Sequence, residues 1–228
     1  MISIVIPVIN EEKIIGDIIN HLQKFVGIEV IFVDGGSEDN TVSIIKKSGF
    51  KVINSPILRR SYQMNLGANN ATGDILLFLH GDTFLPDNFI EVIEETIVKE
   101  NFVAGAFCLQ IDSEKKIFRF LENLVQWRSK LFSLPYGDQG IFISKKQFSS
   151  IDGFDDLKIM EDFALMKKLQ KVGKIYLTKE SVVTSARRWQ KLGVLKTTIV
   201  NQIMIAGYYL GFNDQKLANL YRQIKNAK

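Results

Sequence analysis

The chain has 228 residues, 46% of them hydrophobic and 24% charged, a balance typical of a globular domain and not of a disordered or fibrous protein. Its formal charge of +4 is too small for a nucleic-acid polycation, so we expect no nucleic-acid partner. The single cysteine, Cys108, excludes an intramolecular disulfide and a cysteine-based zinc site, and it fits a reducing cytoplasm.

The first half of the chain alternates short β-branched runs with helical patterns. Four runs predict buried strands: Ile2–Val8, Val30–Asp34, Lys51–Asn54 and Ile75–His80. Apolar residues at helical spacing predict helices over Glu11–Val26 and Thr41–Ser48. This alternation predicts the α/β class, with a parallel sheet flanked by helices.

The second half changes rhythm but shows no linker. Its patterns predict three strands, Val103–Ile111, Gly140–Ser144 and Lys174–Leu177, and two helices, Ile117–Phe132 and Glu161–Val172. From Leu192 onward we expect two helices that separate near Gly211. We therefore expect one α/β domain over residues 1–190 and a C-terminal helical extension over residues 191–228.

Acidic residues follow three neighbouring predicted strands and should meet at one edge of the sheet. They are Glu11 after the first strand, Asp34 and Asp39 after the second, and Asp82 after the fourth. Ligands of open α/β sheets bind at this edge, where a carboxylate can accept a uracil N–H, bind ribose or hold a divalent cation. Asp34 could instead be a turn residue, and Asn10 and Asp39 could simply cap helices.

No Gly-x-Gly-x-x-Gly sequence or Walker loop follows the first strand. A bound nucleotide must then use a metal and side chains for its phosphates. Arg59 and Arg60, or the later pair Arg187 and Arg188, can supply positive charge, although the first pair could also be a solvated helix start.

Several ordered segments resemble family 2 glycosyltransferases of the GT-A fold. They are Ser3–Glu12, Asp34–Thr41, Arg60–Ala68, Ile75–Thr83, Gly137–Gly140, Gly153-Phe154 and Met160–Asp162, and together they cover nearly the whole chain. The family's Asp-x-Asp motif departs here, because His80 replaces its first aspartate while Asp82 is kept. With the later Arg187-Arg188-Trp189, this resembles a compact His-x-Asp-Thr branch found beside arsenosugar and carotenoid-type biosynthesis enzymes.

The resemblance implies inverting, metal-dependent transfer of a sugar from a nucleotide diphosphate sugar, most simply a UDP-sugar, to an acceptor hydroxyl. It implies a mostly parallel sheet with a nucleotide-binding half over about residues 1–100 and an acceptor half over about 101–190. Mg²⁺ or Mn²⁺ would bind at Asp82, and His80 would contact ribose or join the metal shell. The residues implied for the nucleotide sugar are Pro7, Asn10, Glu11, Asp34, Gly36, Ser37, Asp39, Arg60, Asn65, His80, Gly81 and Asp82.

The same resemblance assigns Asp162, beside Glu161, as the base that takes the acceptor proton, with Asp138 as a second candidate. Acidic residues in a first helical turn can also serve only the helix dipole. The acceptor and diphosphate residues would be Gln139, Arg187, Arg188 and Trp189, although Trp189 could equally pack in the core. His21 lies within the first helix, where we expect a surface residue without a role.

The C-terminal segment carries an apolar stripe beside basic residues. The stripe consists of Leu195, Ile199, Ile203, Ala206, Tyr209 and Leu210. It could bind a membrane surface, which suits a lipid-linked acceptor, or form a homodimer or cover the domain's own core, and we favour the last two. The start of the chain predicts no signal peptide, so we expect a cytoplasmic protein, at most peripheral on the inner face of the cell membrane.

Two other functions compete with sugar transfer. A sugar nucleotidyltransferase would place a Gly-rich basic loop after the first strand, and Ile9–Lys13 is not one. A nucleotide-sugar-binding protein that has lost catalysis would not need to keep Asp82, Glu161, Asp162 and Arg188.

Overall fold

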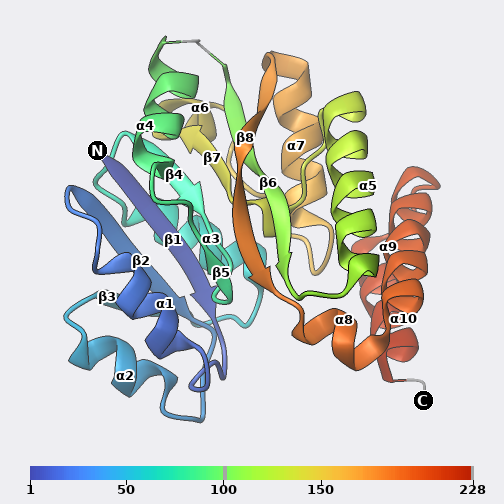
Figure 1. The fold of residues 1–228 in the computed structure, drawn as a ribbon, viewed down its shortest axis with the longest axis horizontal. Helices are drawn as coiled ribbons and strands as arrows, with labels where there is room; N and C mark the ends of the chain where they lie inside the picture. Colours follow the sequence, from blue (N-terminus) through green and yellow to red (C-terminus); the bar gives the residue numbers. More distant parts are fainter. Residues whose placement is uncertain (100–101, 227–228) are drawn as a thin grey trace.

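The computed structural model describes residues 1–99 and 102–226, and the strands of this part form one curled sheet (Figure 1). The strands are β1 (Ile2–Val8), β2 (Ile28–Asp34), β3 (Lys51–Asn54), β4 (Ile75–Phe78), β5 (Thr83–Phe84), β6 (Ala104–Asp112), β7 (Ile141–Ser144) and β8 (Ile175–Ser185). They lie in the order β3-β2-β1-β4-β7-β6-β8-β5. Neighbours from β3 to β4 are parallel, as are β6 and β8, whereas β7 is antiparallel to both β4 and β6, and β5 to β8. The predicted α/β class with a mostly parallel sheet is confirmed.

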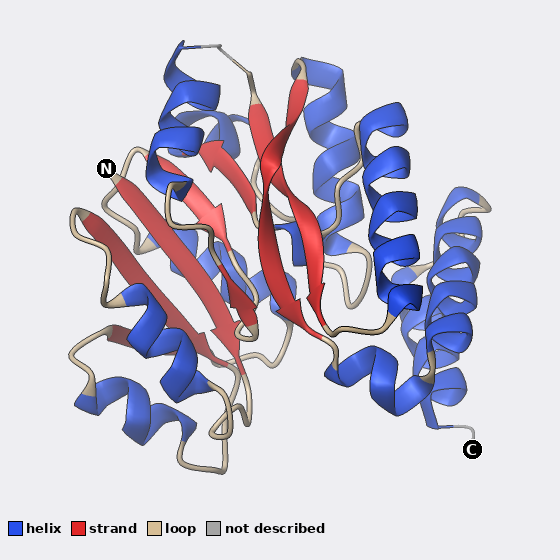
Figure 2. Cartoon of the chain, in the orientation of Figure 1, coloured by secondary structure: helices blue, strands red, loops and turns tan. Residues whose placement is uncertain are grey.

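Helices cover both faces of this sheet (Figure 2). They are α1 (Ile15–Leu22), α2 (Thr41–Lys47), α3 (Arg60–Asn69), α4 (Phe89–Glu94), α5 (Lys116–Phe132), α6 (Lys145–Ser150), α7 (Glu161–Val172), α8 (Arg187–Leu192), α9 (Val194–Tyr209) and α10 (Asp214–Asn226). A π-helical turn, Glu95–Lys99, continues α4, and a 3₁₀ turn, Gly137–Gln139, precedes β7.

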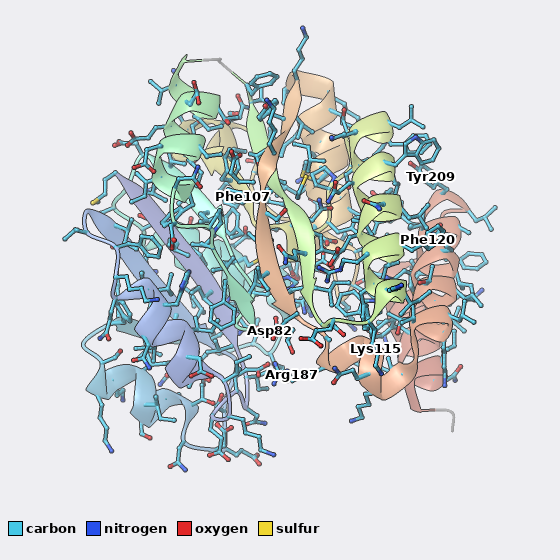
Figure 3. The ribbon with its side chains drawn as sticks, viewed as in Figure 1. Asp82, Phe107, Lys115, Phe120, Arg187 and Tyr209 are labelled. Carbon is cyan, nitrogen blue, oxygen red and sulfur yellow. The ribbon has the colours of Figure 1, made fainter. Side chains whose placement is uncertain are left out.

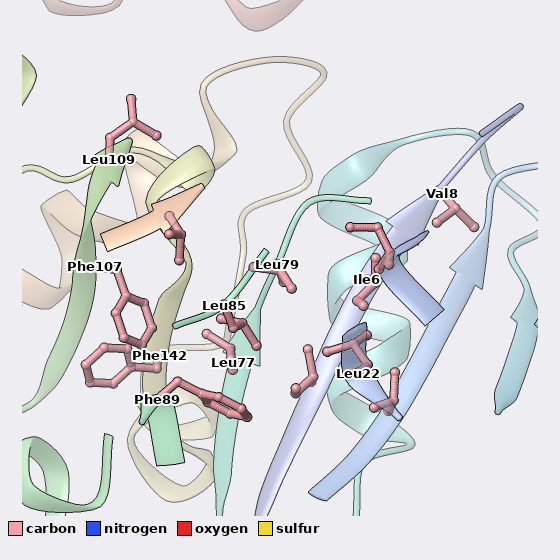
Figure 4. Packing of buried hydrophobic residues seen from close by; sticks show 14 of the residues in the cluster. Ile6, Val8, Leu22, Leu77, Leu79, Leu85, Phe89, Phe107, Leu109 and Phe142 are labelled. Atoms are coloured by element: carbon pink, nitrogen blue, oxygen red, sulfur yellow. The ribbon is translucent and has the colours of Figure 1, made fainter. Parts of the chain in front are cut away.

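The central strands supply two cores because successive side chains point to opposite faces of a sheet. On β4, Ile75 and Leu77 belong to the cluster under α1, α2 and α4, whereas Leu76 and Phe78 belong to the cluster under α3, α6 and α7. Figure 4 shows part of the first cluster, where Leu77 lies near Phe89 of α4. Burial on both faces explains why these strands are continuously apolar in sequence.

Several element boundaries differ from the predictions. The strand expected to end at Leu177 continues to Ser185, because β8 pairs with β6 on both sides of an irregularity between Ala106 and Cys108. The polar residues that follow Leu177 break the apolar run, so the sequence pattern did not predict the rest of the strand. The helix expected from Glu11 begins only at Ile15, and β5, α4 and α6 were not predicted.

The C-terminal helices pack on the domain with a different face from the predicted one. The buried residues of α9 are Thr197, Val200, Met204 and Gly207, while most of the predicted stripe is exposed. A Cβ on Gly207 would lie 2.5 Å from Cδ2 of Leu217, so a larger residue there would displace the Leu217 side chain of α10. The expectation that the stripe covers the domain's own core is therefore wrong. Among the described residues, no helix has both the length and the apolar character that crossing a bilayer requires.

Candidate active site

The acidic residues after β1 and β4 meet at the edge of the sheet, as predicted. One guanidinium nitrogen of Arg187, Nη2, donates to Oε2 of Glu11 at 3.0 Å and to Oδ2 of Asp82 at 3.3 Å. Figure 3 shows Asp82 and Arg187 side by side where the strands end. Two carboxylates from different strands thus share one cation at this edge.

The short strand β5 brings Arg187 to this position. Thr83 pairs with Thr184 of β8, and the backbone N–H of Ser185 donates to the carbonyl of Asp82 at 3.2 Å. Because Arg187 follows β8 by two residues, this pairing sets its side chain over the acidic edge.

Glu11 lies in a setting that disfavours its charge. Burial raises the pKa of the Glu11 carboxyl above 4.5; the Arg187 guanidinium opposes this, and the nearby charges of Asp82 and Asp39 add to it. Arg187 therefore balances only part of the negative charge of these carboxylates, and a second cation could bind at this edge.

The loops after β1 and β2 are tied to each other by hydrogen bonds. Asn10 donates its backbone N–H to Oγ of Ser37, and its side-chain oxygen accepts from the backbone N–H of Glu38, each at 2.9 Å. Asp39 accepts from the backbone N–H groups of Glu12 and Thr41. Neither Asn10 nor Asp39 is the N-cap of a helix, since Ile14 and Asn40 hold those positions.

Asp34 is a buried turn residue in this structure. Its carboxylate accepts from the backbone N–H groups of Gly36 and Ser37, at 2.9 and 3.0 Å, and from the Ser37 hydroxyl at 2.5 Å. Gly36 has φ of 97°, which favours glycine. The carboxylate therefore shapes this loop, and any contact with a base would be additional.

A cleft of about 580 Å³ lies beside the acidic edge, and residues from both halves of the chain line it. The sequence-predicted residues that line it are Pro7, Glu11, Arg60, His80, Gly81, Asp82, Asp138, Glu161, Asp162 and Trp189. Lining residues that the sequence did not single out include Gln63, Tyr136, Lys158, Asn201, Tyr221 and Arg222. The last three come from α9 and α10, so the C-terminal helices form one wall.

The start of α7 places two acidic residues at the cleft with different surroundings. Glu161 is buried and its Oε1 lies 3.5 Å from Nη1 of Arg60. Burial raises the pKa of the Glu161 carboxyl; the Arg60 charge opposes this, and the Asp162 charge adds to it. Asp162 accepts from the backbone N–H of Gly137 at 2.6 Å and from that of Phe163 at 2.7 Å.

The contact with Gly137 gives Asp162 a role beyond the helix dipole. It connects α7 to the 3₁₀ turn that carries Asp138, so the two candidate bases belong to one local structure. Arg128 of α5 stacks on Tyr136 at 3.4 Å from the ring centroid. Burial lowers the pKa of the Arg128 guanidinium, while Tyr136 and the carboxylates of Asp138 and Asp162 oppose this shift. Sequence reasoning missed this partly buried cation, since nothing in the spacing relates α5 to α7.

Three predicted contacts have structural roles instead. Gln139 is fully buried, and its side chain bonds Ser129, the Tyr136 N–H and the Phe107 carbonyl, each at 3.0 Å, so it does not face an acceptor. Asn65 exchanges two hydrogen bonds with the backbone of Phe154. Trp189 packs edge-on against Phe118 in the core, and only a small part of it reaches the cleft.

Two further predictions concern individual residues. The side chain of Arg188 lies outside the described residues, although its backbone belongs to α8. His21 is not a surface residue without a role: its Nε2 accepts from the backbone N–H of Leu85 at 3.2 Å, and its ring packs edge-on against Phe25 and Phe84. Burial lowers the pKa of this imidazole. It therefore anchors the segment around β5.

The acidic edge fits a divalent cation of the Mg²⁺ type. Arg187 already shows that Glu11 and Asp82 can share one positive charge. Mg²⁺ typically binds one or two carboxylates and completes its shell with water and substrate phosphates. Within residues 1–99 and 102–226 there is no group of three or more His, Cys, Asp or Glu side chains that could hold a metal ion by themselves.

Comparison with known proteins identifies the family. The model described as glycosyl transferase family 2 matches residues 3–153. The chain is similar to 4,4'-diaponeurosporenoate glycosyltransferase of Staphylococcus haemolyticus, with 31% identity over 110 residues. That alignment covers 44% of this chain and 29% of the relative, so the chain matches less than a third of that protein's length.

Solved structures agree on the fold. TarS 1–349 of S. aureus in complex with UDP-GlcNAc superposes with a TM-score of 0.68 at 18% identity, covering 81% of this chain and 58% of that one. Glucosyl-3-phosphoglycerate synthase of Mycobacterium tuberculosis with Mn²⁺, UDP and phosphoglyceric acid gives 0.61 at 18% identity, covering 81% and 70%. Because the family model covers more than half of the chain and the sheet matches these structures, the chain belongs to glycosyl transferase family 2 and has the GT-A fold.

Proposed function

We propose that this protein transfers a sugar from a UDP-sugar to an acceptor hydroxyl with inversion, using Mg²⁺ or Mn²⁺. The observation that carries the proposal is the cleft, which is lined by Glu11 and Asp82 at the sheet edge and by Asp162 at the start of α7. Arg187 pairs with both Glu11 and Asp82. A diphosphate needs positive charge and an attacking hydroxyl needs a base, and the cleft offers a place for each.

The choice of donor rests on the neighbours' ligands and on the loop after β2. TarS is seen with UDP-GlcNAc, and glucosyl-3-phosphoglycerate synthase with UDP. In this chain the turn held by Asp34 lies beside the first strand's end, where Pro7 lines the cleft. Backbone groups of this turn and the Asp34 carboxylate would contact the uridine.

Asp82, with Glu11 beside it, would hold the divalent ion. When bound, the ion neutralises charge that develops on the departing diphosphate. Arg187 would then leave its two carboxylates and contact a phosphate, because a guanidinium suits phosphate oxygens as well as carboxylates.

Inversion requires one displacement at the anomeric carbon. The acceptor oxygen forms the new glycosidic bond as the bond to the diphosphate breaks, and Asp162 takes the hydroxyl proton. Asp162 is suited to this because the N–H groups of Gly137 and Phe163 donate to its two oxygens and so orient the carboxylate. Asp138, on the adjoining turn, would position the acceptor.

The acceptor proposed is a lipid-linked or other small hydroxyl compound. The carotenoid-directed relative supports a lipid-soluble one. We also propose a cytoplasmic enzyme whose residues 1–190 form the catalytic domain and whose C-terminal helices complete the cleft.

The direct test is release of UDP from a panel of UDP-, GDP- and dTDP-sugars with Mn²⁺, Mg²⁺ or EDTA, together with NMR of the product's anomeric configuration. Asp82→Asn should abolish the metal-dependent rate, because an amide is a neutral and weaker ligand for a hard dication. A nucleotidyltransferase would instead release pyrophosphate from a nucleoside triphosphate and a sugar phosphate. Activity that survives both EDTA and Asp82→Asn would contradict the metal assignment.

A further inference from the structure

Helix α5 carries an apolar stripe on its outer side. Phe118 and Leu121 face the core, but another set at spacings of three and four residues is exposed. This set is Ile117, Phe120, Leu124, Trp127 and Leu131. The exposed fractions of the Phe120 and Trp127 side chains are 67% and 62%. Such exposure is unusual, because large aromatic side chains are mostly buried in globular proteins.

Helix α9 repeats the arrangement. Its exposed apolar residues are Leu195, Ile199, Ile203, Ala206 and Leu210, again at spacings of three and four. Leu195 is 77% exposed, while Val200 and Met204 on the opposite side are buried. Each helix therefore has one apolar side inside the protein and another apolar side outside it.

Residues of α5 and α9, or next to them, pack against the same two core clusters. Val125 of α5 and Val194 of α9 pack against one core cluster. Tyr136, just after α5, and Ile205 of α9 pack against the other. Figure 1 shows both helices at the same side of the molecule, and Figure 3 places Phe120 and Tyr209 there. We name the two exposed stripes together the α5–α9 face.

Positive charges predominate around the α5–α9 face, although the exposed Asp112 and Glu114 lie just before α5. Exposed lysines flank it, namely Lys115, Lys116, Lys130 and Lys191. From Lys115 to Phe132 the only acidic residue is Glu122, which is buried and bonded to Arg119 at 2.7 Å. The sequence from Ser181 to Asn213 contains no acidic residue.

We infer that the α5–α9 face binds the surface of an anionic lipid bilayer. Apolar side chains would enter the interface between headgroups and acyl chains, while the lysines would contact lipid phosphates. A two-fold dimer through the same face would bring the lysines of one copy against those of the other, which opposes that alternative. The inner side of α9 contributes Met204 and Ile205 to the cleft, so the bound bilayer would lie beside the cleft's C-terminal wall.

The test measures binding to vesicles and uses no sugar donor, so its outcome is separate from that of the proposed function. Purified protein is sedimented with vesicles of phosphatidylcholine alone or of phosphatidylcholine mixed with phosphatidylglycerol. We expect co-sedimentation only with the mixed vesicles and release by high salt, since screening weakens attraction between surface charges.

Variants then locate the binding face. Phe120→Gln with Leu195→Gln should weaken binding at least about tenfold, because two large apolar side chains no longer enter the interface. Changing Lys115, Lys116 and Lys191 to glutamine should cost about fivefold for each lysine, the equivalent of about 1 kcal/mol near an anionic surface. Val26→Gln is the control, since Val26 is 89% exposed but follows α1, outside the α5–α9 face.

Three results would overturn the inference. One is equal sedimentation with both kinds of vesicle or with neither. Another is binding that the Phe120→Gln, Leu195→Gln variant leaves unchanged while the protein remains folded by circular dichroism. The third is a dimer in analytical ultracentrifugation that this variant converts to monomer, which would assign the α5–α9 face to a second copy.

Discussion

Replacing Asp162 by asparagine separates catalysis from structure at the cleft. Both carboxylate oxygens of Asp162 accept backbone hydrogen bonds, from Gly137 at 2.6 Å and from Phe163 at 2.7 Å. Asparagine has one oxygen, so its NH₂ group would face one of these N–H donors. The variant therefore loses a hydrogen bond to a charged group, worth about 1.5–3 kcal/mol.

That loss has a measurable effect on stability. For a domain of this size, 1 kcal/mol changes Tm by about 2–4 °C, so Asp162→Asn should lower Tm by roughly 3–12 °C. The protein should nevertheless stay folded at assay temperature and bind UDP nearly as tightly as the wild type, measured by calorimetry. If Asp162 is also the base, turnover with saturating donor should fall by about 10²–10⁴-fold, far more than such a structural change would cause.

Asp138→Asn is the matched control, because Asp138 lines the same cleft on the turn that Asp162 holds. Its turnover should fall less. The reasoning fails if Asp162→Asn keeps a rate within a few-fold of wild type, or if Asp138→Asn is the inactive enzyme. In the second case Asp162 holds the turn and Asp138 is the base.

Three further changes test the surrounding electrostatics and packing. Glu161→Gln should raise Tm at neutral pH, because burial raises the pKa of the Glu161 carboxyl above 4.5 and its ionisation in the folded protein therefore costs stability. The gain should shrink as pH falls from the raised pKa toward 4.5 and be absent below it, and a gain independent of pH would contradict this. Arg187→Met should increase Mn²⁺ affinity without nucleotide by about fivefold, because a partly exposed ion pair to Asp82 is worth roughly 1 kcal/mol; an unchanged Mn²⁺ titration would oppose the assignment. Gly137→Ala places a Cβ 3.1 Å from Oδ2 of Asp162, so kcat should fall by about tenfold with little change in donor binding; an unaltered kcat would show that this contact does not position the carboxylate.

Much of the acidic edge could be predicted from the sequence because local patterns determine it. The apolar runs of β1, β2 and β4 identify the strands, and parallel connections put their carboxyl ends at one edge. Glu11 and Asp82 each follow a strand by a few residues, so their proximity follows from strand order alone. The Asp34 turn could also be read from its Gly-Gly sequence.

The second half of the site depends on contacts that leave no local pattern. Arg187 reaches Glu11 because β8 continues past a bulge and pairs with the two-residue strand β5, and neither feature has an apolar period. Gln139 is buried because Ser129 and Phe107 supply partners from distant segments. The sequence alone does not show whether a glutamine in a loop is buried or contacts a ligand.

Helix α9 illustrates the same division. Its composition predicts a helix with an apolar stripe, and both are present. The helix is apolar on two sides, however, so periodicity does not decide which side faces inward. Packing decides it: Gly207 allows α10 to approach, Val200 and Met204 become buried, and Leu195 and Ile199 remain exposed. The sequence determined that a helix forms, whereas only packing against its tertiary neighbours determined which of its two apolar sides remains exposed.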